Sequence, residues 1–233
     1  MTNIAIDGPA GAGKSTLARS LAGRLGFLYV DTGALYRAVG LFARRNGADP
    51  GDARAVSALL PQIRLELLHG DEGQRVLLNG EDVSDSIRAP EISMAASTVS
   101  AIPAVRAFLL ELQRSIAREN DVLMDGRDIG TVVLPAAQLK IFLTASPQDR
   151  ARRRFEELRL KGSGASYEDV LADVLQRDSQ DSGREIAPLR AADDAVVVDT
   201  TGYEFSQSLE RLYAICRTRL KAEDCSRKDS DRL

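Results

Sequence analysis

Five short apolar runs, separated by stretches with helical periodicity, dominate the hydrophobic pattern of this chain. The runs lie at 3–7, 27–31, 121–125, 139–143 and 195–199. Apolar runs without alternation are typical of strands that are buried on both faces of a parallel sheet. Because these runs alternate with helical stretches, we expect right-handed crossover connections. The pattern predicts an α/β fold with one five-stranded, doubly wound parallel sheet flanked by helices.

The positions between these runs predict six helices. Leucines at 17, 21 and 25 share one face of the first helix, and apolar residues at 105, 109, 112 and 116 mark the inner face of a long one. Thr32 is expected to cap the second helix with its hydroxyl. Arg106 and Arg114 lie elsewhere on the long helix and are by default solvated charges. The predicted helices cover 15–25, 32–46, 103–119, 146–161, 167–181 and 205–221.

The hydrophobic pattern of the chain changes between residues 49 and 102. Segments 63–69 and 75–79 indicate two strands joined by a turn at 71–73, and Asn79-Gly80 offers a second tight turn. An antiparallel patch inside a parallel pattern predicts an insertion of about 60–100 within a single domain over 1–222. His69, the one histidine, has no carboxylate or cysteine at an obvious metal-binding spacing, so we expect a surface position at a strand end.

Composition narrows the class of protein and its partners. The 233 residues are 44% hydrophobic and 28% charged with a net charge of −3. This is ordinary for a globular protein and gives no basic field for nucleic acid or membrane. Cys216 and Cys225 lack C-x-x-C spacing, so neither a disulfide framework nor a zinc site is expected. No apolar run approaches a membrane span. We expect a cytoplasmic monomer with a charged, disordered tail over 223–233.

The first predicted strand runs directly into a glycine-rich loop that fits the pattern G-x-x-x-x-G-K-[ST]. Between a strand and a helix, such a loop wraps phosphate with its backbone N–H groups, and the positive end of the helix points at the same anion. Lys14 is expected to be an exposed cation that reaches the β- and γ-phosphates of ATP, with the Ser15 hydroxyl on Mg²⁺. The residues that we expect to bind ATP here are Gly8, Pro9, Ala10, Gly11, Ala12, Gly13, Lys14, Ser15 and Thr16.

Two further segments suit triphosphate chemistry. The third strand ends in Asp125, and an acid at that strand end, opposite the phosphate loop, is where this architecture holds Mg²⁺ or its water. The arginine-rich helix before Gly162-Ser163-Gly164 carries arginines at 150, 152, 153 and 154. Such a charge run is usually a solvated face, but next to a hinge in a triphosphate-binding protein it favours a closing lid. We expect this lid over about 148–166, with Arg150 and Arg154 contacting ATP.

Several motifs follow one another along the chain: IDGPAGAGKST at 6–16, DTGALYR at 31–37, GEDVSDSIR at 80–88, AAS at 95–97, VR at 105–106, DGRDIGTVV at 125–133, KIFL at 140–143 and an RD…D..R…AP pattern over 177–188. The same motifs occur in this order in the bacterial cytidylate kinases, which this sequence resembles from the first strand to the last helix. The resemblance implies transfer of the γ-phosphoryl group of ATP to CMP or dCMP, and the insertion is itself a feature of the bacterial members.

The resemblance also implies roles for individual residues. Thr32 stands where family members commonly carry serine, so the hydroxyl is kept. Lys14, Asp125, Arg127 and Arg184 are the residues that we expect to act in catalysis. The resemblance assigns the acceptor phosphate to Arg37 and Arg127, the cytosine to Ser97, Arg106 and Asp128, the ribose to Arg177 and Asp181, and a further phosphate contact to Arg184.

The residue types suit this chemistry independently of the resemblance, and three alternatives remain open. Two nucleotides bring several negative charges into one cleft, and arginine binds phosphate bidentately. A kinase for shikimate, gluconate or adenylate would keep the loop but would need neither the insertion nor the acid of DGRD. A GTPase-like switch would normally show N-K-x-D, which is absent. A nucleotide-binding structural subunit has no use for so many arginines.

Overall fold

The computed structural model describes residues 1–70, 73–160 and 162–230, and the chain divides into two compact units. One, here called the P-loop unit, comprises Thr2–Phe27 and the chain from Asp121 onward. The other, here called the insertion unit, comprises Leu28–Asn120 together with Met1. Each unit is described separately below.

The five strands of the parallel sheet coincide with the five predicted runs to within two residues at either end. The strand order is β2-β6-β1-β7-β8. In the P-loop unit, Ile6 of the central strand pairs with Asp125 on one side and Ile141 on the other, both in parallel register. The prediction of a five-stranded parallel sheet is therefore confirmed. The strands are β1 (Asn3–Asp7), β2 (Leu28–Asp31), β6 (Val122–Gly126), β7 (Leu139–Thr144) and β8 (Val196–Asp199).

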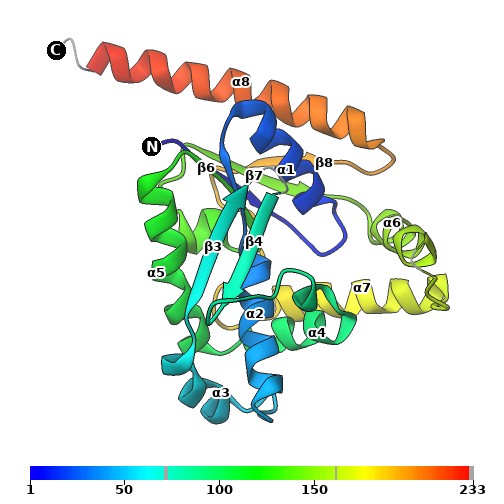
Figure 1. The fold of residues 1–233 in the computed structure, drawn as a ribbon. Coiled ribbons are helices and arrows are strands. Elements are labelled where there is room, and N and C mark those ends of the chain that lie inside the picture. The colour runs from blue at the N-terminus through cyan, green and yellow to red at the C-terminus, as the bar shows by residue number, and fades with distance from the viewer. Residues whose placement is uncertain (71–72, 161, 231–233) are drawn as a thin grey trace. The chain divides into compact units, whose positions relative to one another are not determined.

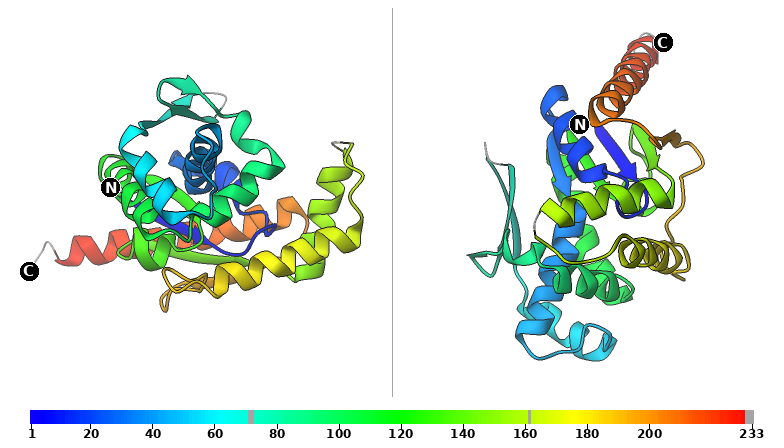
Figure 2. Two further views of the ribbon diagram at one scale, coloured as in Figure 1. Left: turned by 90° about the horizontal axis from the view of Figure 1, so that it is seen from below. Right: turned by 90° about the vertical axis from the view of Figure 1, so that its right-hand side faces the viewer.

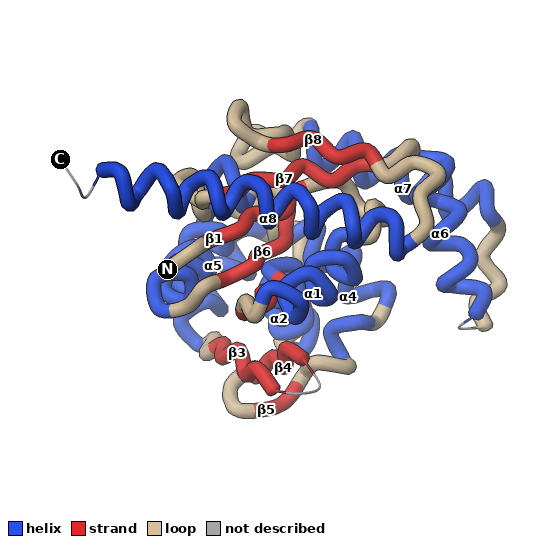
Figure 3. Tube along the Cα trace, turned by 90° about the horizontal axis from the view of Figure 1, so that it is seen from above, coloured by secondary structure: helices blue, strands red, loops and turns tan. Residues whose placement is uncertain are grey.

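The described residues of the P-loop unit form four α-helices beside its strands. The first, α1 (Lys14–Leu25), buries Leu17 and Leu21 and packs beside α8 (Phe205–Ser230), as Figure 1 shows. Seen from above, α8 crosses the row of strands β6, β1 and β7 (Figure 3). The other two, α6 (Pro147–Leu160) and α7 (Tyr167–Ser182), pack against each other (Figure 2). A small cluster of Ala151, Val170 and Val174 forms their shared core.

The end of α8 differs from the sequence prediction. The helix was expected to stop near Lys221, with a disordered tail over 223–233. The structure instead continues the helix through Ser230, and residues 231–233 lie outside the part it describes. The segment was judged by its lack of apolar residues, but its lysine, glutamate, arginine and alanine residues have high helix propensity. A charged segment can therefore extend a helix that packing has already started.

The insertion unit contains more helix than the pattern predicted. Its long helix α5 (Pro103–Glu119) has the predicted bounds, and α2 (Thr32–Arg45) ends one residue before the predicted stop. Two short helices, α3 (Ala53–Leu59) and α4 (Pro90–Val99), were missed. On α4, serine, threonine and branched residues weaken the helical signal, and only Pro90 and Glu91 in the first turn mark its start. An added Cβ on Gly40 of α2 would lie 3.1 Å from the Cβ of Ala95, so a glycine lets α2 and α4 approach closely.

An antiparallel sheet of β3 (Leu65–Gly70), β4 (Gly73–Leu78) and β5 (Glu81–Asp82) confirms the predicted patch. Asn79 and Gly80 have φ angles of 52° and 86° and form the two-residue loop between β4 and β5, as Asn-Gly predicts for a hairpin. Two residues of the other predicted turn, Asp71 and Glu72, lie outside the described residues. Short 3₁₀ turns at Leu60–Gln62 and Ser86–Arg88 connect this sheet to the helices.

The cap of α2 is a correction to the sequence prediction. Asp31, rather than Thr32, precedes the first turn, and its Oδ1 accepts a hydrogen bond of 3.0 Å from the N–H of Ala34. Aspartate is at least as good a helix cap as threonine. Asp31 also has the right position, because it ends β2 and directly precedes the first residue of α2. Thr32 is the first helical residue and is 3% exposed.

No described helix is by itself long and apolar enough to cross a membrane. Only α4 and α5, taken together from Glu91 to Glu119 with a bend of 96° between them, pass that test of length and composition.

Candidate active site

The glycine-rich loop has the backbone geometry that its sequence predicts. Gly11 and Gly13 have φ angles of 75° and 81°, in the left-handed region that glycine adopts without strain. A Cβ on Gly8 would lie 1.9 Å from the carbonyl oxygen of Leu143 on β7, so no other residue fits there. Gly13 is the residue that caps α1. The loop therefore leads into the positive end of a helix, as phosphate binding requires.

Lys14 is buried, which contradicts the expectation of an exposed cation. Its side chain reaches back over the loop, and Nζ donates a hydrogen bond of 2.8 Å to the carbonyl of Pro9. Burial lowers its pKa to about 7, and the positive charge of Arg127 acts in the same direction. Asp125, Asp7 and Asp181 oppose this shift. The lysine is thus held near the loop in an environment that disfavours its own charge until an anion arrives.

The loop serine and the acid at the end of β6 are brought together as predicted. Ser15 Oγ donates a hydrogen bond of 2.9 Å to Oδ2 of Asp125, which is 3% exposed. A hydroxyl and a carboxylate are hard oxygen donors, and Mg²⁺ usually takes one or two such protein ligands and completes its shell with phosphate and water. The pair fits a magnesium ion. In the described residues no group of three or more His, Cys, Asp or Glu side chains is placed to hold a metal by itself.

Asp181 of α7 binds two of the arginines that the sequence predicts at the site. Its Oδ2 accepts a hydrogen bond of 2.8 Å from Nε of Arg127, and its Oδ1 accepts one from Arg184. The carboxylate is 5% exposed, so both contacts lie in a desolvated environment where charge pairing is strong. Arg177, one turn earlier on α7, pairs with Asp173 at 3.2 Å. The structure therefore brings Arg127, Asp181 and Arg184 together.

Arg150 connects three segments of the P-loop unit: the phosphate loop, the end of β7 and α7. Its guanidinium makes a bidentate pair with Asp178 of α7, at 2.9 and 2.5 Å, and donates to the carbonyls of Ala10 and Ala145, each at 2.9 Å. The side chain is 3% exposed. Arg154, further along α6, is more exposed and pairs with Glu157 at 2.8 Å. Whether either arginine contacts ATP stays a prediction.

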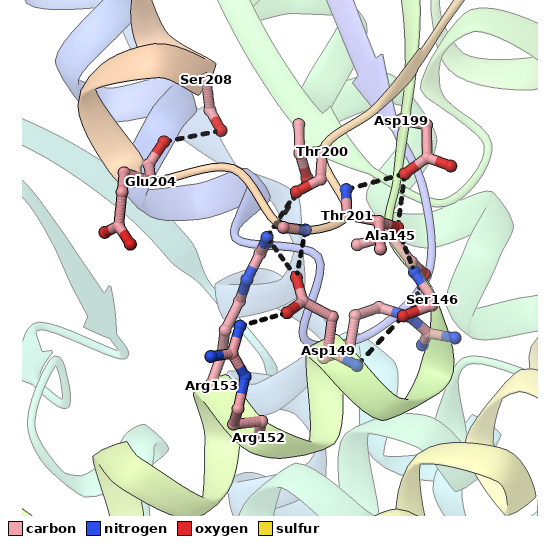
Figure 4. A network of polar contacts seen from close by, with 12 residues as sticks. Ala145, Ser146, Asp149, Arg152, Arg153, Asp199, Thr200, Thr201, Glu204 and Ser208 are labelled. Carbon is pink, nitrogen blue, oxygen red and sulfur yellow. Dashed lines mark hydrogen bonds and ion pairs between the residues drawn. The ribbon is translucent and has the colours of Figure 1, made fainter.

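The start of α6 is also tied to the segment after β8, as Figure 4 shows. Asp149 pairs with Arg152 and Arg153, and the guanidinium of Arg153 donates a 2.7 Å hydrogen bond to the carbonyl of Thr200. The N–H of Gly202 lies 3.4 Å from Asp149 Oδ2. Contacts with the segment after β8 therefore anchor the first turns of the predicted lid.

Within the insertion unit, Arg37 and Asp31 form a half-buried pair. An NH2 group of Arg37 donates to Asp31 Oδ2 at 2.7 Å, while the other carboxylate oxygen caps α2. Gln74 of β4 fixes the backbone of Asp31, because its Oε1 accepts the Asp31 N–H at 2.8 Å. Nε of Arg37 is buried, and no hydrogen bond to it is made by any described residue. Asp31 therefore orients the Arg37 guanidinium, and its Nε–H donor makes no hydrogen bond to any described residue.

The predicted base contacts of the insertion unit lie at the junction of α4 and α5. Arg106 is 9% exposed, which corrects its default interpretation as a solvated charge. It donates to the carbonyl of Ser100 at 3.1 Å, and its guanidinium carbon lies 5.7 Å from the centre of the Tyr36 ring. Ser97 is half-buried and its carbonyl accepts the hydroxyl of Ser100 at 2.7 Å.

Several residues of these clusters were not singled out from the sequence. Asp7, Asp178 and Tyr36 act on predicted site residues through contacts that local spacing does not reveal. A signal existed for each of them, because all three lie inside motifs quoted for the resemblance. His69 is exposed as predicted, at the end of β3, and its Nε2 lies 3.0 Å from the carbonyl of Tyr29. The predicted site residues of the insertion unit are Thr32, Arg37, Ser97 and Arg106; the others all belong to the P-loop unit.

Comparison with known proteins identifies the family. The cytidylate kinase family model matches residues 4–218. The cytidylate kinase of Carboxydothermus hydrogenoformans is 52% identical over 212 residues, which cover 91% of this chain and 96% of that protein. The cytidylate kinase of Geobacter sulfurreducens is 49% identical over 219 residues, 94% of each chain.

A solved structure of an uncharacterized protein from Eubacterium ventriosum shares the fold, with a TM-score of 0.54 at 10% identity over 94% of this chain and 99% of that one. That likeness concerns the fold alone. The family model and relatives of about half identity both cover most of the residues, and so this chain belongs to the cytidylate kinase family.

Proposed function

We propose that this protein transfers the γ-phosphoryl group of ATP to CMP and dCMP, giving CDP and dCDP. The observation that carries the proposal is membership of the cytidylate kinase family over residues 4–218. A phosphate loop whose Ser15 donates a hydrogen bond to the acid Asp125 supports it independently. Phosphoryl transfer has a loose, charge-rich transition state, so catalysis consists mainly of positioning and charge neutralisation.

On the donor side, the backbone of residues 8–16 would bind the phosphates of ATP, and Lys14 would neutralise the transferred group. ATP brings negative charge to a lysine whose pKa burial has lowered to about 7, so its protonated form is restored when the nucleotide binds. The Ser15 hydroxyl and the Asp125 carboxylate would hold Mg²⁺, which supplies further neutralisation of phosphate charge when bound. Arg150 and Arg154 are proposed as ATP contacts from the lid over about 148–166.

On the acceptor side, Arg37 and Arg127 would bind the phosphate of CMP. Each already has one carboxylate partner, and each guanidinium presents several N–H donors in a planar fork that matches phosphate. Arg184 would reach the phosphates from beside Asp181, and Arg177 with Asp181 would bind the ribose. Thr32 would add a hydroxyl near the acceptor.

Base choice follows from hydrogen-bond polarity. Cytosine presents an amino donor and two acceptors, whereas uracil presents O4 as an acceptor and N3–H as a donor. An ionised Asp128 only accepts and Arg106 only donates, so together they match cytosine and oppose uracil. A buried mismatch costs about 1–3 kcal/mol per polar group, so CMP should exceed UMP by roughly 10² in kcat/KM. Ser97 would complete the base contacts.

We also propose that the protein is a cytoplasmic monomer whose partners are its nucleotides alone. One coupled assay tests the function: ADP formation with CMP, dCMP, UMP, AMP and GMP as acceptors. We expect CMP and dCMP to give the highest kcat/KM. Phosphate release from ATP without an acceptor, unstimulated by CMP, would instead indicate an ATPase or a switch protein. A higher kcat/KM with AMP or GMP would contradict the proposed acceptor.

A further inference from the structure

Asp7, the last residue of β1, binds the loop that carries Arg127 and Asp128. Its two carboxylate oxygens accept separate backbone hydrogen bonds, one from the N–H of Ile129 and one from the N–H of Gly130, each at 2.7 Å. The carboxylate is 4% exposed. The next residue, Gly8, begins the phosphate loop. A single side chain therefore connects the start of the ATP-binding loop with the segment that follows the proposed base reader.

The segment bound by Asp7 is a single π-helical turn, Ile129–Val133, that begins directly after Asp128. The first N–H groups of any helical turn lack partners within the turn and need an acceptor. An aspartate at the position of Asp128 commonly supplies that acceptor with its own side chain. Here Asp128 makes no such capping bond. Asp7 caps the turn in its place.

Gly130 confirms how closely this turn approaches β1 and β7. A Cβ at Gly130 would lie 3.1 Å from Cδ of Lys140 and 3.3 Å from Oδ2 of Asp7. The contact is therefore tight enough that one added methyl group must shift its neighbours. π-turns of this kind occur frequently at functional sites.

We propose that Asp7 is a positioning residue for base selection: it caps the turn after Asp128, so that the Asp128 side chain does not turn back to cap its own helix. This inference rests on the proposed role of Asp128. Burial raises the pKa of Asp7 to about 6, against the two backbone N–H groups that lower it; the neighbouring charges are Asp128 and Lys14. At neutral pH both oxygens of Asp7 are therefore acceptors.

Asp7→Asn is the direct test, because the amide keeps the volume but has one acceptor and one donor. One of the two backbone N–H groups then faces an NH₂ group, and the Asp128 carboxylate can rotate to cap the turn itself. We expect the CMP:UMP ratio of kcat/KM to fall about tenfold, mainly through loss of CMP activity, while the KM for ATP changes less than about threefold. A purely structural role would lower the melting temperature and leave that ratio unchanged.

Two further variants make the test specific. Gly130→Ala disturbs the same turn with Asp7 intact, so its ratio should fall in the same direction; it carries the test alone if Asp7→Asn does not fold. Lys140→Met is the matched control, because it keeps the buried stem beside Gly130 and removes only the charge that pairs with Asp194. Its CMP:UMP ratio should equal that of the parent.

Asp128→Asn separates this inference from the function on which it rests. If both single variants lower the ratio and the double variant Asp7→Asn/Asp128→Asn is no lower than the stronger single one, the two residues act through one path, as proposed. If Asp128→Asn lowers the ratio but folded Asp7→Asn and Gly130→Ala keep the parent value, Asp7 does not position the reader. If Asp128→Asn keeps the ratio, the role of Asp128 itself is wrong, and the inference falls with it.

Discussion

Arg37 of the insertion unit and the arginines around Asp181 and Asp178 of the P-loop unit are held in different ways. In the P-loop unit, carboxylates already bind the arginines: the buried Asp181 binds Arg127 and Arg184, and the half-buried Asp178 binds the buried Arg150. In the insertion unit, Arg37 shares its carboxylate with a helix cap and keeps a buried Nε without a hydrogen bond to any described residue.

The difference separates two tasks. Paired arginines are oriented before ATP arrives and limit the repulsion between cations, which suits a unit that must surround a transferring group. A cation with unused donors suits recognition of an incoming acceptor. Substitutions of the phosphate-loop residues should therefore reduce turnover, and substitution of Arg37 in the insertion unit should change the use of CMP.

Lys14→Met should have the largest effect. It removes the cation expected at the transferred phosphoryl group and should lower kcat by about 10² or more, on the order of 3 kcal/mol. The nucleotide-free protein should become more stable at pH 7. The folded-state pKa of Lys14 is below its ordinary value, so the folded protein binds fewer protons between about pH 7 and 10.5.

The cost of burying Lys14 is therefore complete below pH 7 and falls as the pH rises through that window. Thermal unfolding at pH 6 and pH 9.5 checks the sign, since the variant's advantage in melting temperature should shrink at the higher pH. A folded variant with turnover within a few-fold of the parent would remove Lys14 from the mechanism.

Arg37→Ala should have a smaller and more selective effect. Loss of a charge-assisted bond to the acceptor phosphate costs about 1.5–3 kcal/mol, so kcat/KM for CMP should fall roughly 10- to 10²-fold with little change in the KM for ATP. Arg75→Ala is the matched control, because Arg75 forms an exposed ion pair with Asp82 in the same unit, where such pairs contribute little. An equal rise in the KM for ATP would show that the two units do not divide the work.

Proton uptake offers a subtler test of the P-loop unit. At pH 8 most Lys14 side chains are neutral if their pKa is about 7, and bound phosphates should recharge them. ATP binding should then take up a fraction of one proton, which calorimetry in two buffers of different ionisation enthalpy measures. The uptake should vanish in Lys14→Met. The same uptake in parent and variant would assign it to another group.

The smallest expected effect concerns the lid. Because Asp149 and Arg153 anchor the start of α6, closure should involve the segment from Arg154 to about 166. Saturating ATP analogue and CMP together should slow protease cleavage near Gly162-Ser163-Gly164 a few-fold, since closure orders the hinge. Cleavage that is unchanged by both nucleotides would contradict a lid.

The sequence predicts most of the sheet and the donor loop because their signals are local. Buried strands read as apolar runs, and the phosphate loop places its glycines, lysine and serine at fixed spacing, so geometry at Gly8 and the contact of Ser15 with Asp125 followed from it. The burial of Lys14 and Arg106 was not predictable, because it depends on segments that are distant in sequence.

Helix caps and the carboxylate partners of the arginines were harder still to predict from the sequence. Asp31 displaced Thr32 as the cap of α2 because Asp31, the last residue of β2, directly precedes the first helical residue. Arg150 reads as one of four similar lid arginines, and only the fold of α7 reveals that Asp178 binds it. The roles of Asp7 and Asp178 come from contacts across more than 25 residues, which no periodicity encodes.

The CMP:UMP ratio of kcat/KM, measured for the parent and for Asp128→Asn, tests the central claim most directly. The account predicts a parent ratio of roughly 10². In Asp128→Asn an amide can donate to uracil O4 while its oxygen still accepts from the cytosine amine, so the ratio should shrink mainly through loss of CMP activity, with the KM for ATP nearly unchanged. A folded variant that keeps the parent's ratio would show that Asp128 does not read the base, and a parent that uses UMP as well as CMP would contradict the proposed specificity.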